Sequence, residues 1–142
     1  AKGFSQVCFL DTYEGKYLEE LGGMNMFVVM ADGTIRTPEL TGVILEGGTR
    51  SAILRLLRDE GVDVREEKIA LSEVVDGIRS GAVAEVFACG TAAVVTPITR
   101  LGGDDFDVEI EVGDKTREIH KRLTDIQWGR AEDPYGWTYR LV

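Results

Sequence analysis

Residues 24–37 read MNMFVVMADGTIRT, and this stretch decides the fold. Residues 24–30 are rich in residues that favour β-strands, residues 34–37 form a second such run, and Ala31-Asp32-Gly33 lies between them. Asp-Gly between two β-rich runs is a strong hairpin signal, because both residues tolerate the backbone angles of a tight turn. We therefore predict two antiparallel strands joined at Asp32-Gly33.

Further elements are predicted on both sides of this hairpin. A helix is expected to begin at residues 47–49, with Thr49 as its N-cap, because apolar residues then recur at helical spacing until Gly61. A second helix is expected over residues 72–78, capped by Ser72 and ended near Gly81. Asp114 is expected to cap the last helix, whose apolar face is Ile119, Leu123 and Ile126. Other strands are predicted over residues 6–11, 16–21, 62–70, 84–88, 92–95 and 104–112, with a terminal strand or extended segment at 137–139.

Strands with interspersed helices indicate a mixed α+β (α/β) class. The length suits one domain, so we expect residues 1–142 to form a single domain with a hydrophobic core. No internal repeat or low-complexity linker divides the chain.

Composition excludes several functional classes. The net charge of −9 disfavours binding to the phosphate backbone of DNA or RNA. No apolar stretch approaches the roughly 20 residues of a membrane span, and the first residues lack the apolar core of a signal peptide. The chain does not begin with methionine, so we expect it to start partway through a longer polypeptide.

The residues that most often bind metals or act as nucleophiles are few. Cys8 and Cys89 are far apart, a pattern typical of buried, reduced cysteines in a cytosolic protein, with a disulfide as the alternative. His120 is the only histidine and stands in a charged helical stretch, so we interpret it as a surface residue. No cysteine and histidine cluster has zinc-ligand spacing, and no metal is expected.

Three motifs suit ligand binding, although each alone also fits a simpler explanation. Residues 46–50 (EGGTR) open a helix whose unpaired amide groups suit a phosphate, or they form an ordinary glycine turn and cap. Residues 89–93 (CGTAA) place amides and a hydroxyl toward a ligand, or form a tight turn packed with small residues. Residues 19–25 (EELGGMN) offer an inward carboxylate, or two surface glutamates before a turn.

Taken in order, these motifs resemble the branched-chain amino-acid aminotransferases, which are pyridoxal-phosphate enzymes of fold type IV. The resemblance is carried by residues 20–25 (ELGGMN), 37–50 (TPELTGVILEGGTR), 85–94 (EVFACGTAAV) and 123–129 (LTDIQWG), and Gly-Trp at 136–137 also fits. It covers essentially the whole chain as the carboxy-terminal, cofactor-binding half. It implies the fold of that half, a barrel-like mixed sheet flanked by helices, and membership of a cytoplasmic homodimer.

The resemblance also implies roles for individual residues. Glu20 would pair with the pyridine nitrogen of pyridoxal 5'-phosphate, because an adjacent carboxylate keeps that nitrogen protonated. Gly48 and Thr49 would bind the cofactor phosphate, and Thr91 would contact it too. The amides of Thr91 and Ala92 would receive the substrate carboxylate. The redox-active Cys-x-x-Cys of some relatives is absent, since residues 93–96 read AVVT.

No catalytic residue is expected within the chain. The family's Schiff-base lysine lies upstream of the Glu20 motif, and the lysines present (Lys2, Lys16, Lys68, Lys115 and Lys121) do not stand in such a segment. The amino-terminal domain, with its phosphate-binding arginine, is expected to be a missing partner. The parent enzyme would transfer amino groups between leucine, isoleucine or valine and 2-oxoglutarate. The alternatives are a non-catalytic ligand-binding or assembly module, and a sibling enzyme such as a D-amino-acid aminotransferase.

Overall fold

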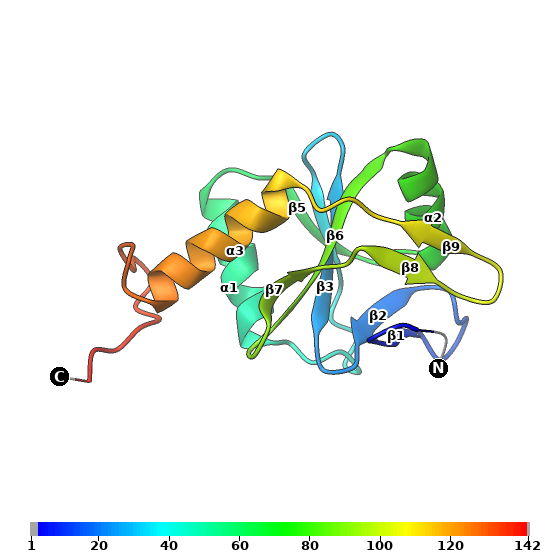
Figure 1. Ribbon diagram of the computed structural model, residues 1–142. Helices are drawn as coiled ribbons and strands as arrows, with labels where there is room; N and C mark the ends of the chain where they lie inside the picture. The colour runs from blue at the N-terminus through cyan, green and yellow to red at the C-terminus, as the bar shows by residue number, and fades with distance from the viewer. Residues whose placement is uncertain (1–2, 142) are drawn as a thin grey trace.

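The computed structural model describes residues 3–141 and is built around a five-stranded sheet of order β5-β4-β3-β6-β7 (Figure 1). Strands β4 and β5 are parallel, and the other neighbours in this sheet are antiparallel. Two smaller sheets pair β1 with β2 and β8 with β9. The strands are β1 Cys8–Leu10, β2 Leu18–Leu21, β3 Asn25–Met30, β4 Ile35–Pro38, β5 Val64–Glu67, β6 Val83–Gly90, β7 Val94–Pro97, β8 Arg100–Gly102 and β9 Asp107–Glu109. The helices are α1 Gly48–Asp59, α2 Leu71–Ser80 and α3 Asp114–Gln127.

The predicted hairpin is confirmed and forms the middle of the central sheet. Val28 pairs with Arg36 and Val29 with Ile35 across β3 and β4. At the turn, the Asp32 carboxylate accepts a 2.9 Å hydrogen bond from the Thr34 amide, and Gly33 adopts a φ of 92° that favours glycine. Because β3 also pairs with β6 along its length, it is buried on both edges as well as on both faces.

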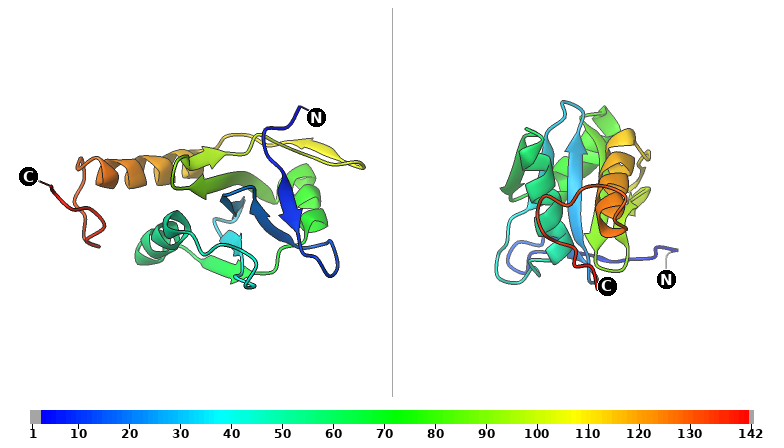
Figure 2. Two further views of the ribbon diagram at one scale, coloured as in Figure 1. Left: turned by 90° about the horizontal axis from the view of Figure 1, so that it is seen from below. Right: turned by 90° about the vertical axis from the view of Figure 1, so that its left-hand side faces the viewer.

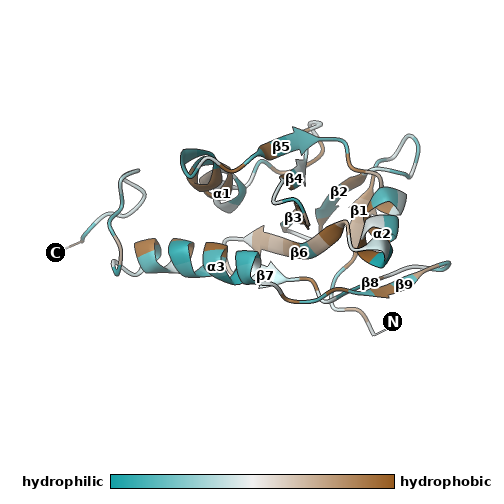
Figure 3. Cartoon of the chain, turned by 90° about the horizontal axis from the view of Figure 1, so that it is seen from above, coloured by the Kyte–Doolittle hydropathy of each residue, from teal (hydrophilic) through white to brown (hydrophobic). Residues whose placement is uncertain are grey.

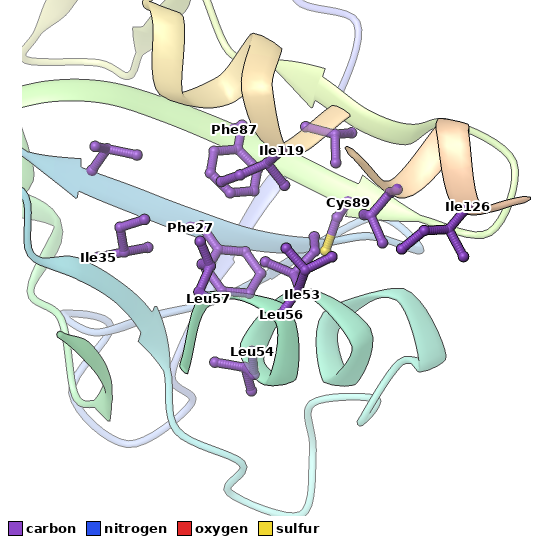
Figure 4. Close-up of a cluster of buried hydrophobic side chains, with 13 residues drawn as sticks. Phe27, Ile35, Ile53, Leu54, Leu56, Leu57, Phe87, Cys89, Ile119 and Ile126 are labelled. Atoms are coloured by element: carbon purple, nitrogen blue, oxygen red, sulfur yellow. The ribbon is translucent and has the colours of Figure 1, made fainter. Parts of the chain in front are cut away.

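Alternation along β3 divides the core into two clusters. Phe27 and Val29 face α1 and α3, whereas Met26 and Val28 face α2 and the β8–β9 sheet. In the first cluster the rings of Phe27 and Phe87 stack at 5.1 Å between centroids, and side chains of both helices surround them (Figure 4). Helices α1 and α3 therefore cover the same face of the sheet.

The outer surfaces of the helices are polar. Figure 3 shows α3 as mostly hydrophilic with interspersed apolar turns, as expected for an amphipathic helix. Ile119, Leu123 and Ile126 are its buried apolar residues, so the predicted face is confirmed. The described chain ends lie at opposite sides of the molecule: residues after α3 extend away from the sheet, and the amino-terminal end lies beside β1 (Figure 2).

Several boundaries differ from the predictions. The mixed α+β class is confirmed, but the described strands form separate sheets and do not close into a barrel, because β5 and β7 remain edges. Residues 137–139 form no strand, which leaves the predicted alternative of an extended segment. Within the predicted 104–112 strand only Asp107–Glu109 is a strand, and it pairs with the unpredicted β8. No helix within residues 3–141 is long and apolar enough to cross a membrane.

The predicted helix ends are right at the carboxy termini and wrong at the amino termini. Gly81 directly follows α2, and Gly61 follows Glu60, the C-cap of α1; their positive φ values of 84° and 77° are typical of glycines that end helices. Ser72, Asp114 and Thr49, however, all lie inside their helices rather than at the N-cap. The N-cap positions are Ala70, Gly113 and Gly47, and none of them makes a side-chain capping hydrogen bond.

Candidate functional site

Two of the three predicted motifs, residues 19–25 and 89–93, lie next to one another because the first residue of β3 is paired with the end of β6. Asn25 is opposite Cys89, so the turn that precedes β3 lies beside the hairpin that follows β6. Gly90 permits this close approach, since a Cβ atom there would lie 3.1 Å from Cγ of Met24. The motifs around Glu20 and Thr91 are therefore neighbours in space although about 70 residues separate them in the sequence.

The third motif joins them through the peptide groups of Leu45. The half-buried Glu20 accepts a hydrogen bond from the Leu45 amide at 3.2 Å, and the Nδ2 atom of Asn25 donates to the Leu45 carbonyl at 2.8 Å. Glu20 and Asn25 flank the tight turn that links β2 to β3, in which Leu21 and Met24 exchange backbone hydrogen bonds. The segment leading into α1 is thus held by side chains from both sides of this turn.

The amino terminus of α1 is open to an anion. Its N-cap is Gly47, with a φ of 70°, no side-chain capping hydrogen bond is made, and the first turn contains no acidic residue. A Cβ atom on Gly48 would meet no atom within 4 Å, so the approach to this turn is unobstructed. Because the first amides of a helix have no partner within the helix and carry partial positive charge, this turn has the donors that a phosphate group needs.

Arg50 adds a buried positive charge to the same turn, and the motif analysis did not single it out. The side chain is only 2% exposed, and its Nη2 atom donates to the Pro38 carbonyl at 3.1 Å and to Glu66 at 2.9 Å. Its Nε atom has no acceptor among the described residues. The pKa of Glu66 is lowered by its hydrogen bond with Arg58 and further by Arg50. In the sequence, the feature that could have identified Arg50 was its position directly after Gly48-Thr49.

Gly48 and Thr49 line a cavity of about 350 Å³ between α1, α3 and the carboxy-terminal segment. Its other lining residues are Ser51, Ala52, Arg55, Leu123, Ile126, Gln127, Trp137 and Thr138. Trp137 stacks on Tyr135 at 4.2 Å, and the Arg55 guanidinium lies 4.7 Å from the Tyr135 ring. Glu20, Thr91 and Ala92 are not among the lining residues of this cavity. The cavity therefore joins two of the five predicted site residues, while hydrogen bonds and strand pairing link the motifs that contain the others.

Thr91 and Ala92 lie in the exposed loop that connects β6 to β7. Gly90 and Val94 close this hairpin as a strand pair. Val94 takes a φ of 56°, an uncommon conformation for a β-branched residue, while its side chain packs against the core cluster of Phe27 and Phe87. Core packing of Val94 therefore holds the loop in a conformation that isolated valine would disfavour.

The remaining candidate residues lie outside this site or are inert. Both cysteines are free; Cys89 is buried and Cys8 is partly buried. Burial raises the pKa of Cys8 to about 11 and that of Cys89 to about 12, which keeps both thiols protonated at neutral pH. His120 is exposed on α3. Within residues 3–141, no group of three or more histidine, cysteine or acidic side chains is arranged to hold a metal ion.

Comparison with known proteins gives this arrangement a family. Residues 1–101 match the model of the amino-transferase class IV family. A probable branched-chain-amino-acid aminotransferase of Streptomyces coelicolor is 43% identical over 145 aligned residues, which cover 100% of this chain and 40% of the relative. Branched-chain-amino-acid transaminase 1 of Bacillus subtilis is 42% identical, with 98% of this chain and 40% of the relative covered.

Solved structures agree with the sequence relatives. The branched-chain amino acid aminotransferase of Escherichia coli superposes with a TM-score of 0.83 at 30% identity, covering 99% of this chain and 43% of that one. A second branched-chain enzyme, solved in complex with N-(5'-phosphopyridoxyl)-L-glutamate, gives 0.80 at 30% identity and covers 97% of this chain and 43% of that one. The chain spans about two fifths of the length of the relatives it matches. By its sequence, its fold and the order of its motifs, the chain belongs to the amino-transferase class IV family.

Proposed function

We propose that this chain is the cofactor-binding portion of a branched-chain amino-acid aminotransferase that uses pyridoxal 5'-phosphate. The reaction would be reversible amino transfer from leucine, isoleucine or valine to 2-oxoglutarate. The names of the sequence relatives support the substrate class, and the phosphopyridoxyl compound in one of the related structures supports the cofactor. The arrangement of this chain's own residues supports the cofactor.

The open first turn of α1 fits the cofactor phosphate. Its amides have no acidic neighbour in the turn, Gly48 leaves the approach free, and the Thr49 hydroxyl is available on the half-buried side chain. The Arg50 guanidinium in the same turn is paired with Glu66 at 2.9 Å, so the positive potential at this turn comes from the helix amides. A dianionic phosphate would therefore meet dipoles of the complementary sign.

Glu20 would hold the proton of the pyridine nitrogen. One of its oxygens accepts from Leu45, which fixes the side chain and leaves the second oxygen for a ligand. When bound, pyridoxal phosphate would supply an aldehyde that can carry the amino group and a ring that withdraws electrons, more strongly when its nitrogen is protonated. The amides of Thr91 and Ala92 would orient the substrate by its carboxylate.

One observation carries the proposal. The Glu20 carboxylate is hydrogen-bonded to Leu45, and Gly47, the uncapped start of α1, follows only two residues later. A carboxylate for a ring nitrogen and an amide cradle for a phosphate are thus held by one short segment. A helix start with no role in binding would be expected to have a capping side chain, and it would not need a carboxylate beside the segment.

Activity measurements test the proposal. The 142-residue chain incubated with pyridoxal phosphate, leucine and 2-oxoglutarate should form no 4-methyl-2-oxopentanoate, because the family's lysine is expected upstream. The protein as its gene encodes it should form this product. Product from the isolated chain would overturn the expectation that the lysine lies elsewhere. Binding of pyridoxal phosphate without turnover by the gene's full product would favour the non-catalytic module.

A substrate panel separates the sibling enzymes. A 4-amino-4-deoxychorismate lyase of Pseudomonas aeruginosa shares the fold with a TM-score of 0.73 at 24% identity, a likeness that concerns the fold alone. Leucine, isoleucine and valine should exceed D-alanine and 4-amino-4-deoxychorismate as substrates of the gene's full product. The amino-terminal partner domain, the homodimer and the cytoplasmic location remain predictions, tested by intact mass, light scattering and cell fractionation.

A further inference from the structure

We propose that Asn25 is a positioning residue that couples the Glu20 carboxylate to the phosphate-binding turn of α1, and this inference rests on the proposed function. Asn25 is a buried polar side chain, 7% exposed, at the first position of β3. A buried amide is costly unless it is hydrogen-bonded, so a side chain of this kind at a strand end calls for a specific partner. Its partner is the segment that leads into the open helix.

Both sides of the Asn25 amide act on that segment. Nδ2 donates to the Leu45 carbonyl at 2.8 Å. Oδ1 lies against Gly47, where an added Cβ atom would stand only 2.2 Å away. Gly47 is therefore in direct contact with the Asn25 side chain, and its positive φ of 70° sets the direction in which α1 begins.

Leu45 links this contact to Glu20. Its amide donates to Glu20 at 3.2 Å, while its carbonyl accepts from Asn25, so two neighbouring peptide groups are held from both sides. The Leu45 side chain itself is 71% exposed and does not anchor the segment by packing. Ile44, the residue before it, is buried at 8% exposure, and the hydrogen bonds to Asn25 and Glu20 hold the chain from Leu45 onward to Gly47.

Asn25 also fixes where the segment stands relative to the third motif. It is the strand partner of Cys89, the residue before Gly90 and Thr91. Asn25 is thus linked to all three parts of the site. Its side chain contacts Gly47 and reaches Glu20 through Leu45, and its backbone pairs with the residue two before the loop that holds Thr91. Loss of the Asn25 amide should loosen residues 45–47 and move the first α1 amides away from the phosphate, without removing any group that touches the ligand.

The test compares Asn25→Ala with a matched control, Thr37→Val. Thr37 is also buried and donates through Oγ1 to the Met26 carbonyl at 2.7 Å, so the control loses a similar bond without touching Leu45 or Gly47. Dissociation constants for pyridoxal phosphate and for unphosphorylated pyridoxal are measured on the gene's full product and both variants. We expect Asn25→Ala to weaken the binding of pyridoxal phosphate by about tenfold or more and the binding of pyridoxal by less than about threefold. Thr37→Val should shift neither ligand by more than about threefold.

Hydrogen exchange at the amides of residues 45–51 provides a readout that does not need bound ligand. Exchange should accelerate there in Asn25→Ala and stay unchanged in Thr37→Val, and Asn25→Ser provides a second variant if the alanine protein folds poorly. Equal weakening of both ligands, or unchanged exchange at residues 45–51, would overturn the role of Asn25. Failure of the unaltered protein to bind pyridoxal phosphate would instead overturn the proposed function, and the coupling inference with it.

Discussion

The amino termini of α1 and α3 are built alike but used differently. Each helix follows a glycine that makes room for a side chain from the central sheet: Asn25 against Gly47, and Glu85 against Gly113. At α3 the buried Glu85 carboxylate accepts the amides of Thr116 at 2.9 Å and Lys115 at 3.3 Å. At α1 the Asn25 amide binds Leu45 instead, and no hydrogen bond joins the first helical amides to a side-chain acceptor among residues 3–141.

Under the proposed function, this difference means that the same structural arrangement stabilises the fold at α3 and serves binding at α1. A carboxylate on helix amides uses the positive end of the helix within the fold, so α3 has fewer free donors and less positive potential for a ligand. An amide in the equivalent place supports the chain but leaves the helix donors free. The first turn of α3 also contains an acidic residue, Asp114, whereas the first turn of α1 contains none.

The largest effect is expected from Gly47→Ala. The new side chain would be strained by the φ of 70° and would collide with Asn25, so we expect a loss of about 3 kcal/mol in the free energy of unfolding. Gly61→Ala is the control, because Gly61 has a φ of 77° but nothing within 4 Å of an added Cβ atom, which predicts about 1 kcal/mol from strain alone. Urea unfolding measures both. Equal losses would show that Asn25 does not constrain Gly47.

Glu85→Ala should be next, with a loss of about 2 kcal/mol, because it removes the acceptor of two α3 amides. Glu85→Gln keeps one neutral acceptor and should lose about 1 kcal/mol. Affinity for pyridoxal phosphate should stay unchanged in both, since the cap of α3 is separate from the α1 turn. A weaker affinity at unchanged stability would contradict the division of roles between the two helices.

Gly48→Asp would make α1 resemble α3. Open space at Gly48 accepts the side chain, and a carboxylate in the first turn should stabilise the fold by about 0.5 kcal/mol through the helix dipole. The same charge should repel the phosphate and weaken the binding of pyridoxal phosphate by about tenfold or more. Gly48→Asn is the neutral control and should retain most of the affinity. Unchanged binding by the aspartate variant would exclude this turn as the phosphate site.

The smallest effect concerns a third carboxylate that binds backbone amides within the fold. Hydrogen bonds from the amides of Tyr17, Glu14 and Lys16 lower the pKa of Asp11 from its ordinary 3.8 to about 2. Because the folded-state pKa is lowered, the stabilisation is fully present above about pH 4 and fades as the pH falls toward 2. The stability difference between the unaltered chain and Asp11→Asn should therefore shrink over this interval, as thermal unfolding at several pH values would reveal.

Sequence patterns predicted the elements better than their ends. Two β-rich runs around Asp32-Gly33 indicated the β3–β4 hairpin, and the 4-then-3 spacing of Ile119, Leu123 and Ile126 indicated the buried face of α3, because both signals are local. Helix caps were predicted from the nearest polar residue, and this was wrong at α1, α2 and α3. The acceptor at α3 comes from Glu85 on another element, which no local pattern encodes.

By itself, the sequence determined the mixed class, the central hairpin and the glycine-rich start of α1. Tertiary structure alone decided that Glu85 would occupy the α3 terminus, that Arg50 would be buried, and that Glu20 and Asn25 would meet at Leu45. The physical reason is that hydrophobic periodicity and turn preferences act over a few neighbouring residues. Which terminus receives a carboxylate, and which stays open for a ligand, depends instead on strand register between residues far apart in the chain.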